Sequence, residues 1–226
     1  MDQTGEVSRD PSARTIAVVY LVYFLVGLTA GFLVRGVVVP GDPAATVSHL
    51  LASGTRYRIG IGVDLLANLL YITVTALFYR LFRPVNPSLS LIAAFLSLAG
   101  CVVQIGGELL RLAAVLLLRD PSLATAFSPS QLQAAALTSL NLYTQSFHLS
   151  FVLFACFDLL LGTLILKSNF FPRFLGIVMV AAGVGCLTFL WPPLATSLRW
   201  IVLPLGGLAE VALMLWLLVK GVNPPK

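Results

Sequence analysis

The sequence predicts an all-α fold, a polytopic membrane helix bundle with six transmembrane helices. Hydrophobic residue types make up 58% of the 226 residues and charged types only 10%, whereas a soluble domain carries roughly 25% charged residues. The apolar residues gather in runs that reach the about 20 residues needed by a membrane helix. The basic residues behind the net charge of +5 lie at the ends of these runs, which is typical of membrane topology signals. We therefore expect the lipid bilayer as a partner and no nucleic acid.

The first apolar run extends from Thr15 to Val34. A signal peptide has a shorter core of roughly 7 to 15 residues and a small-residue cleavage site, so this run predicts an uncleaved first membrane helix. We expect residues 1–14 to be a polar cytoplasmic N-terminus, residues 15–220 to be the six-helix transmembrane domain, and residues 221–226 to be a cytoplasmic tail.

A short interfacial helix is predicted after the first span, in the segment GDPAATVSHLLASG. Asp42 is suited to cap this helix, Pro43 to occupy its first position and Gly54 to end it. Its apolar residues share one side, which favours a position along the membrane surface.

The next two apolar runs predict the second and third membrane helices, from about Tyr57 to Phe78 and from about Leu89 to Leu118. Two further runs predict the fifth and sixth helices. The fifth follows Arg173 and ends at Trp191, and the sixth covers residues 198–219.

The fourth membrane helix is predicted to be unusually long. The sequence Ser128-Pro129-Ser130-Gln131 is a capping box with proline at the first helical position, and no helix breaker follows before Lys167. The helix would be about 55 Å long at 1.5 Å per residue, against a hydrocarbon core of about 30 Å. We therefore expect an extended fourth helix that projects beyond the bilayer or kinks.

Basic residues predict which helix ends face the cytoplasm, because loops rich in lysine and arginine stay inside. With the N-terminus inside, the cytoplasmic side receives more basic residues than the outside does. This favours a multi-pass protein of the cell membrane with both termini cytoplasmic. The cytoplasmic set is Arg9, Arg14, Arg80, Arg83, Lys167, Arg173, Lys220 and Lys226, and the outside set is Arg35, Arg56, Arg58, Arg119 and Arg199.

Four segments resemble those of a known family in their amino-acid sequence and in their order along the chain. They are PGDPAATVSHLLASGTRYRIGIGVDLL (residues 40–66), YRLFRPVNP (79–87), FPRFLG (171–176) and EVALMLWLLVKGV (210–222). Together with the spacing of the spans, they are similar to the bacterial membrane proteins of domain-of-unknown-function family 4386. The resemblance implies a multi-pass protein of a bacterial inner membrane. It implies no activity, cofactor or site residue.

Charged and strongly polar residues within the spans are the candidates for function, because each costs at least about 2.5 kcal/mol at mid-bilayer. They recur every three or four residues on the second, third and fourth spans, which gives each span a polar stripe. The rise per residue places these stripes in the outer half of the bundle, where they can line one cavity. Glu210, near the middle of the sixth span, can approach from below. The candidate polar site comprises Asp64, Asn68, Gln104, Glu108, Arg111, Gln145, His148 and Glu210.

Acidic side chains outnumber basic ones within the spans, so each acid raises the question of which group offsets its charge. Glu108 and Arg111, three residues apart on one helix face, are expected to pair. Asp158 is rotated by roughly 80° from the stripe of His148 at 100° per residue, and we expect it to be a separate buried acid. The remaining acids need a partner, a bound cation or a proton. The alternative for each acid is a structural role, in which it is protonated or hydrogen-bonded and sets the helix register.

Three functions are compatible with these residues. The sequence favours a non-enzymatic bundle whose polar cavity, in the outer half, binds a small molecule, a lipid headgroup or a cation. The second function is a proton- or cation-coupled carrier that uses intramembrane carboxylates. The third is an intramembrane metal-dependent hydrolase, which is disfavoured because the sequence has two histidines and no HExxH or GxSxG motif. The sequence assigns no catalytic residue, metal ligand, cofactor or oligomeric state.

Overall fold

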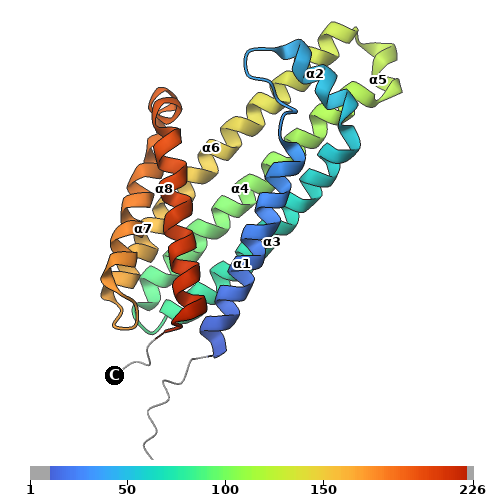
Figure 1. The fold of residues 1–226 in the computed structure, drawn as a ribbon. Coiled ribbons are helices and arrows are strands. Elements are labelled where there is room, and N and C mark those ends of the chain that lie inside the picture. The colour runs from blue at the N-terminus through green and yellow to red at the C-terminus, as the bar shows by residue number, and fades with distance from the viewer. Residues whose placement is uncertain (1–10, 223–226) are drawn as a thin grey trace, which may run out of the picture. The chain divides into compact units, whose positions relative to one another are not determined.

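The structure of the protein, a computed structural model, describes residues 11–222 (Figure 1). Within this range every regular element is a helix, and six helices are long and apolar enough to cross a membrane. The prediction of an all-α polytopic bundle is therefore confirmed. Residues 1–10 of the predicted N-terminal segment and residues 223–226 of the predicted tail lie outside the described residues.

The first membrane helix and the interfacial helix form where the sequence predicts them. Helix α1 spans Pro11–Val34 and begins earlier than expected, since proline suits the first turn of a helix. Helix α2 spans Pro43–Ala52, and the Asp42 carboxylate caps it by accepting a hydrogen bond from the Ala45 N–H at 2.9 Å. The predicted N-cap is therefore confirmed.

Gly54 has a different role from the predicted one. Helix α2 ends at its C-cap Ser53, and Gly54 is the first residue of α3, Gly54–Phe82. A side chain at position 54 would collide with the guanidinium of Arg119, which donates a hydrogen bond to the Leu51 carbonyl of α2. Glycine leaves room here for the close approach of this arginine and does not mark the end of a helix.

Helix α4 spans Pro87–Arg119 and is followed directly by α5, Pro121–Ala126, a short helix that the sequence analysis does not predict. Asp120 caps α5, because its carboxylate accepts hydrogen bonds from the Ser122 hydroxyl at 2.7 Å and from the Ser122 N–H at 2.9 Å. These bonds stabilise the charged form and lower the pKa of the Asp120 carboxyl below its ordinary value.

Helix α6 is one uninterrupted helix of 39 residues, Pro129–Lys167. The predicted capping box is confirmed at its start. The Ser128 N–H donates to Gln131 Oε1 at 2.9 Å, and the Gln131 N–H donates to Ser128 Oγ at 3.3 Å. At 1.5 Å per residue α6 is about 58 Å long, nearly twice the about 30 Å of a hydrocarbon core. It is the extended fourth membrane helix.

The last two membrane helices form as predicted but with different ends. Helix α7 spans Arg173–Cys186 and continues as the 3-10 turn η1, Leu187–Leu190. Helix α8 spans Pro192–Val219, and it begins before the expected Leu198 because prolines suit the first helical turn. Its interior contains Pro204, which lies within the predicted sixth span of residues 198–219. Figure 1 shows α7 and α8 packed side by side.

Contacts between Cα atoms divide the chain into two compact units. Unit 1 comprises the described residues of Met1–Val22, Leu70–Gly100 and Phe151–Lys226, and unit 2 comprises Tyr23–Leu69 and Cys101–Ser150. Helices α1, α3, α4 and α6 contribute residues to both units.

Each unit has a hydrophobic cluster of its own. The unit 1 cluster joins α6, α7, η1 and α8 through Ala155, Cys186, Phe189, Ala195 and Val202. The unit 2 cluster lies next to the candidate site, with which it shares Tyr57. It consists of Val37, Leu50, Tyr57, Ile61, Ala114, Val115, Ala136 and Leu140.

Candidate functional site

A buried arginine is at the centre of the candidate site in unit 2. Only 2% of the Arg111 side chain is exposed. Its Nη1 donates to Asp64 Oδ2 of α3 at 2.5 Å and to Glu108 Oε2 of α4 at 2.8 Å. Its Nε donates to the Tyr57 hydroxyl at 3.2 Å. The pairing expected from the spacing of Glu108 and Arg111 is present, and Asp64 joins it from a second helix.

Two tyrosine rings cover the guanidinium. The Arg111 Cζ lies 4.8 Å from the centre of the Tyr57 ring and 5.1 Å from the centre of the Tyr143 ring on α6. Arg111 Nη2 is buried and has no hydrogen-bond partner among residues 11–222. Cation–π attraction to the two rings therefore offsets part of the cost of burying this charge.

Helices α4 and α6 approach closely beside Arg111 because residue 107 is a glycine. A Cβ atom at Gly107 would lie 3.0 Å from Ser146 Oγ and 3.3 Å from Tyr143 Cδ2. The Ser146 hydroxyl donates to the Val103 carbonyl, one turn earlier on α4, at 2.9 Å. Ser146 is therefore on the face of α6 that packs against α4.

A small polar cavity adjoins the ion pairs. Its volume is about 50 Å³, which is room for a few water-sized groups, since one needs roughly 10–15 Å³. Asp64 is the more exposed of the cavity's two acidic residues, since 27% of its side chain is exposed against 6% for Glu108. The lining residues are Asp64, Asn68, Gln104, Gly107, Glu108, Tyr143, Ser146 and Phe147.

The cavity walls present oxygen atoms that can accept further bonds. Asp64 and Glu108 each bind Arg111 through one carboxylate oxygen, which leaves the second oxygen of each carboxylate. The Asn68 amide nitrogen donates to the Asp64 backbone carbonyl at 3.0 Å, which leaves the amide oxygen as an acceptor. Carboxylate and amide oxygens are the ligands that hard cations prefer.

The charges of the site favour a cation over an anion. Two carboxylates bind one guanidinium, so the three groups carry one net negative charge when all are ionised. Within residues 11–222, no three His, Cys, Asp or Glu side chains gather as metal ligands would. A cation in this cavity would therefore be held by amide and hydroxyl oxygens as well as by the two carboxylates.

The predicted site residues of α3 and α4 come together, whereas those of α6 do not. On α6, Gln145 is exposed and His148 is half-buried, and neither lines the cavity. The lining residues of α6 include Tyr143, which is about 200° from Gln145 around the helix at 100° per residue. The predicted residues that line the cavity or bind beside it are Asp64, Asn68, Gln104, Glu108 and Arg111.

The cavity residues of α6 are not predicted from the sequence, because they are less polar than their neighbours. Tyr143, Ser146 and Phe147 line the cavity, and their spacing of three and four residues marks one helix face. That spacing was the available signal. It is weaker than the signal of the amide and imidazole side chains on the other face.

The remaining predicted residue, Glu210, belongs to unit 1. Its carboxyl group accepts hydrogen bonds from the hydroxyls of Tyr20 and Tyr71 and interacts electrostatically with Asp158. The structure therefore places Glu210 with Asp158, the acid that the sequence analysis keeps separate. Depth along a helix was the basis of the predicted grouping, and depth does not specify which helices are neighbours.

Comparison with known proteins gives the family of the chain. No curated protein and no solved structure matches it. The family model described as a domain of unknown function, DUF4386, matches residues 15–221, which includes all six membrane helices except the first turn of α1. The chain therefore belongs to the DUF4386 family of domains of unknown function.

Proposed function

We propose that the protein is a non-enzymatic membrane helix bundle whose unit 2 cavity binds a small monovalent cation. The observation that supports this most directly is the pair of carboxylates, Asp64 and Glu108, held by the single guanidinium of Arg111 beside a polar cavity. One monovalent cation neutralises the net negative charge of these three groups.

The size of the cavity favours an ion over the larger ligands. Sites for drug-sized molecules have volumes of about 300–1,000 Å³, whereas this cavity has about 50 Å³. A lipid headgroup is too large for it. An alkali cation with one or two bound waters fits, and the oxygens of Asn68 and Ser146 add neutral ligands to the carboxylates.

We also propose that the protein lies in the cell membrane with both termini on the cytoplasmic side. The support is the distribution of basic residues, because the positive-inside rule assigns basic turns to the cytoplasm. The turn between α3 and α4 follows Arg80 and contains Arg83, and the turn between α6 and α7 is flanked by Lys167 and Arg173.

The cation proposal is tested by thermal unfolding of the purified full-length protein in detergent. NaCl, LiCl and KCl are titrated against choline chloride at constant ionic strength. A cation that binds only the folded state stabilises it by RT ln(1 + [L]/Kd), so Tm should rise with the concentration of at least one alkali cation. The rise should be lost in Asp64→Asn and Glu108→Gln, each of which removes one negative charge from the cavity.

The matched control is Gln145→Ala, which changes an exposed polar residue of α6 outside the cavity lining. This variant should keep the full dependence of Tm on the cation. The proposal fails if no alkali cation raises Tm more than choline does. It also fails if the two cavity variants respond to the cation as the unaltered protein does.

A further inference from the structure

A buried aspartate and a half-buried glutamate in unit 1 form a second polar cluster that the cation site does not use. Asp158 lies on α6 and Glu210 on α8, and the two side chains interact electrostatically. We propose that Asp158 and Glu210 form a proton-binding site in which one proton is shared between the two carboxyl groups. The proposal is independent of the cation site in unit 2.

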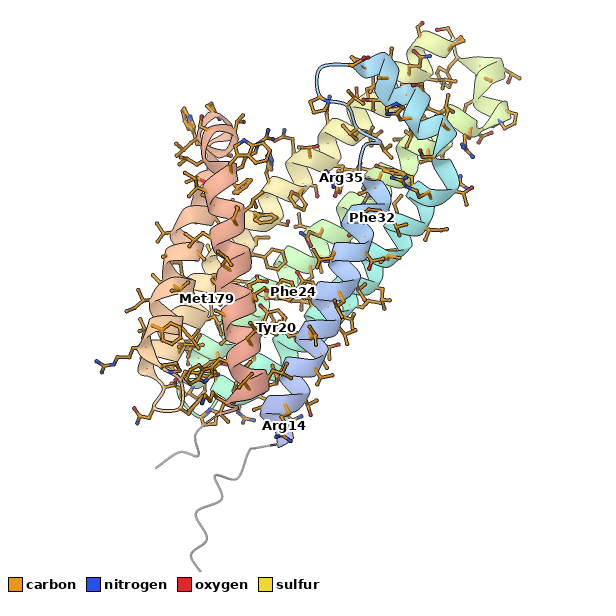
Figure 2. The ribbon with its side chains drawn as sticks, viewed as in Figure 1. Arg14, Tyr20, Phe24, Phe32, Arg35 and Met179 are labelled. Atoms are coloured by element: carbon orange, nitrogen blue, oxygen red, sulfur yellow. The ribbon has the colours of Figure 1, made fainter. Side chains whose placement is uncertain are left out.

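Tyrosines from two further helices complete the cluster. The hydroxyls of Tyr20 on α1, labelled in Figure 2, and Tyr71 on α3 form hydrogen bonds to the Glu210 carboxyl group. The two tyrosine ring centres lie 6.3 Å apart, which allows both hydroxyls to reach one carboxyl group. Glu210 is therefore equipped to carry the negative charge of the pair.

One carboxylate oxygen of Asp158 has no such support. Only 5% of the residue is exposed, and its Oδ1 is buried without a hydrogen-bond partner among residues 11–222. Aromatic rings gather at Tyr71 of this cluster, whose ring lies 5.4 Å from the Phe154 ring and 6.4 Å from the Phe157 ring, centre to centre. An ionised carboxylate with an unpaired oxygen is costly in such an environment.

No basic side chain neutralises the pair in the described part of the chain. The two ion pairs found there both belong to Arg111 of unit 2. The titratable groups that interact with Asp158 and Glu210 are Tyr20, Tyr71 and the Cys186 thiol on α7, and none of them is a cation. Two adjacent carboxylates cannot both ionise cheaply without a counter-charge.

One bound proton removes both the repulsion between the two carboxylates and the unpaired buried oxygen of Asp158. Bound to Asp158, it forms an O–H bond that turns the unpaired oxygen into a donor, and the proposed acceptor is the Glu210 carboxylate, with which Asp158 interacts electrostatically. Uptake converts a pair with two negative charges into one with a single charge, and release reverses this with no electron transferred. The two carboxyl groups titrate together, so the bound proton is assigned to the pair and not to either residue alone.

The donors around the pair favour a proton over a metal cation. The Tyr20 and Tyr71 hydroxyls direct their hydrogens at Glu210, so they supply donors where a metal ion requires oxygen acceptors. The unit 2 cavity differs in this respect, because amide and carboxylate oxygens line it.

The experiment is infrared spectroscopy of the full-length protein in lipid nanodiscs at neutral pH. A protonated carboxyl group has a C=O stretching band that a carboxylate lacks, and the band shifts in D₂O. We expect this band in the unaltered protein and its loss in Asp158→Asn. In Glu210→Gln the band should shift or disappear, because the acceptor of the shared proton changes. Raising the pH should remove the band from the unaltered protein as the proton leaves.

The control is Asp120→Asn, which replaces the exposed acid that caps α5 and should leave the band unchanged. Circular dichroism and gel filtration establish that each variant is folded. The proposal is overturned if the folded, unaltered protein lacks the band, or if the band persists unchanged in both Asp158→Asn and Glu210→Gln. Loss of the band on adding Na⁺ at constant pH would identify a metal-cation site and would also overturn it. Neither result bears on the Tm test of the unit 2 cavity, which uses different residues and a different readout.

Discussion

Arg111 determines the electrostatics of unit 2. It forms ion pairs with two carboxylates at once, Asp64 from α3 and Glu108 from α4. Removing charges from water is expensive, and a buried ion pair is sustained only while each member keeps its partner. The two carboxylates are therefore more sensitive to loss of the arginine than an exposed pair would be.

We predict that Arg111→Met destabilises the protein by about 3–5 kcal/mol, since it leaves two carboxylates beside a cavity without a cation. The free energy of unfolding is measured by denaturant titration in mixed micelles. The triple variant Arg111→Met, Asp64→Asn, Glu108→Gln should recover much of the loss, because no uncompensated charge remains. Exposed Arg58→Met is the control and should change stability by about 0.5 kcal/mol or less. Equal losses in the Arg58 and Arg111 variants would contradict this view of the site.

At the scale of the elements, glycines on α6 and α7 allow their backbones to touch in unit 1. A Cβ atom on Gly162 would lie 2.8 Å from the Gly176 carbonyl oxygen, and one on Gly176 would lie 2.8 Å from the Gly162 carbonyl oxygen. Gly183 has the same relation to the Ala155 carbonyl, also at 2.8 Å. Small residues permit such close packing between membrane helices, where apolar surface alone gives little driving force.

We predict that Gly162→Ala destabilises the protein by about 1–3 kcal/mol, because the added methyl group meets backbone atoms that cannot turn aside. The matched control is Gly106→Ala on α4, where a Cβ would have no atom within 4 Å. Alanine favours a helix over glycine by roughly 1 kcal/mol, so the control should retain or slightly exceed the original stability. Both are measured by denaturant titration in mixed micelles. A loss in Gly106→Ala as large as that in Gly162→Ala would show that steric contact is not the cause.

The capping residues of α2 and α6 can be predicted from sequence, whereas the face of α6 that lines the cavity cannot. The caps of α2 and α6 depend on residues three positions apart, Asp42 with Ala45 and Ser128 with Gln131, and such local signals can be read from sequence. The face of α6 cannot be read this way. Gln145 lies about 33 Å from Lys167 at 1.5 Å per residue, farther than the about 30 Å of a hydrocarbon core. An exposed polar residue there can contact water, so its polarity does not indicate the inside of the bundle.

At the scale of the whole molecule, hydropathy predicts the six membrane helices because each span must be apolar whatever its neighbours are. The neighbours themselves depend on packing between residues far apart in the chain. Glu210 was expected beside Asp64 and Glu108, whereas the structure surrounds it with Tyr20, Tyr71 and Asp158. Periodicity and depth determine the face and height of a side chain on its own helix, and neither selects the helix opposite.

Two arginines on the side of the membrane proposed to be outside bind backbone carbonyls at helix ends. Arg56 donates to the carbonyls of Leu33 at 2.6 Å and Arg35 at 2.8 Å, at the end of α1. Arg119 donates to the Leu51 carbonyl near the end of α2. Positive charge at helix C-termini is stabilising, so these two arginines have a structural reason to be on the side proposed to be outside. They do not weaken the positive-inside argument.

We predict a cytoplasmic location for both termini, tested with reporters in a bacterial host. Green fluorescent protein fused to the C-terminus, or after Asn86, should fluoresce, and alkaline phosphatase at the same positions should be inactive. Fusions after Val38 or Phe127 should give the opposite result, because those turns connect helices on the other side. The variant with Arg56→Gln and Arg119→Gln should keep this pattern, since the basic turns at Arg80 and Arg83 remain. A reversed pattern, or activity of both reporters at one position, would contradict the orientation.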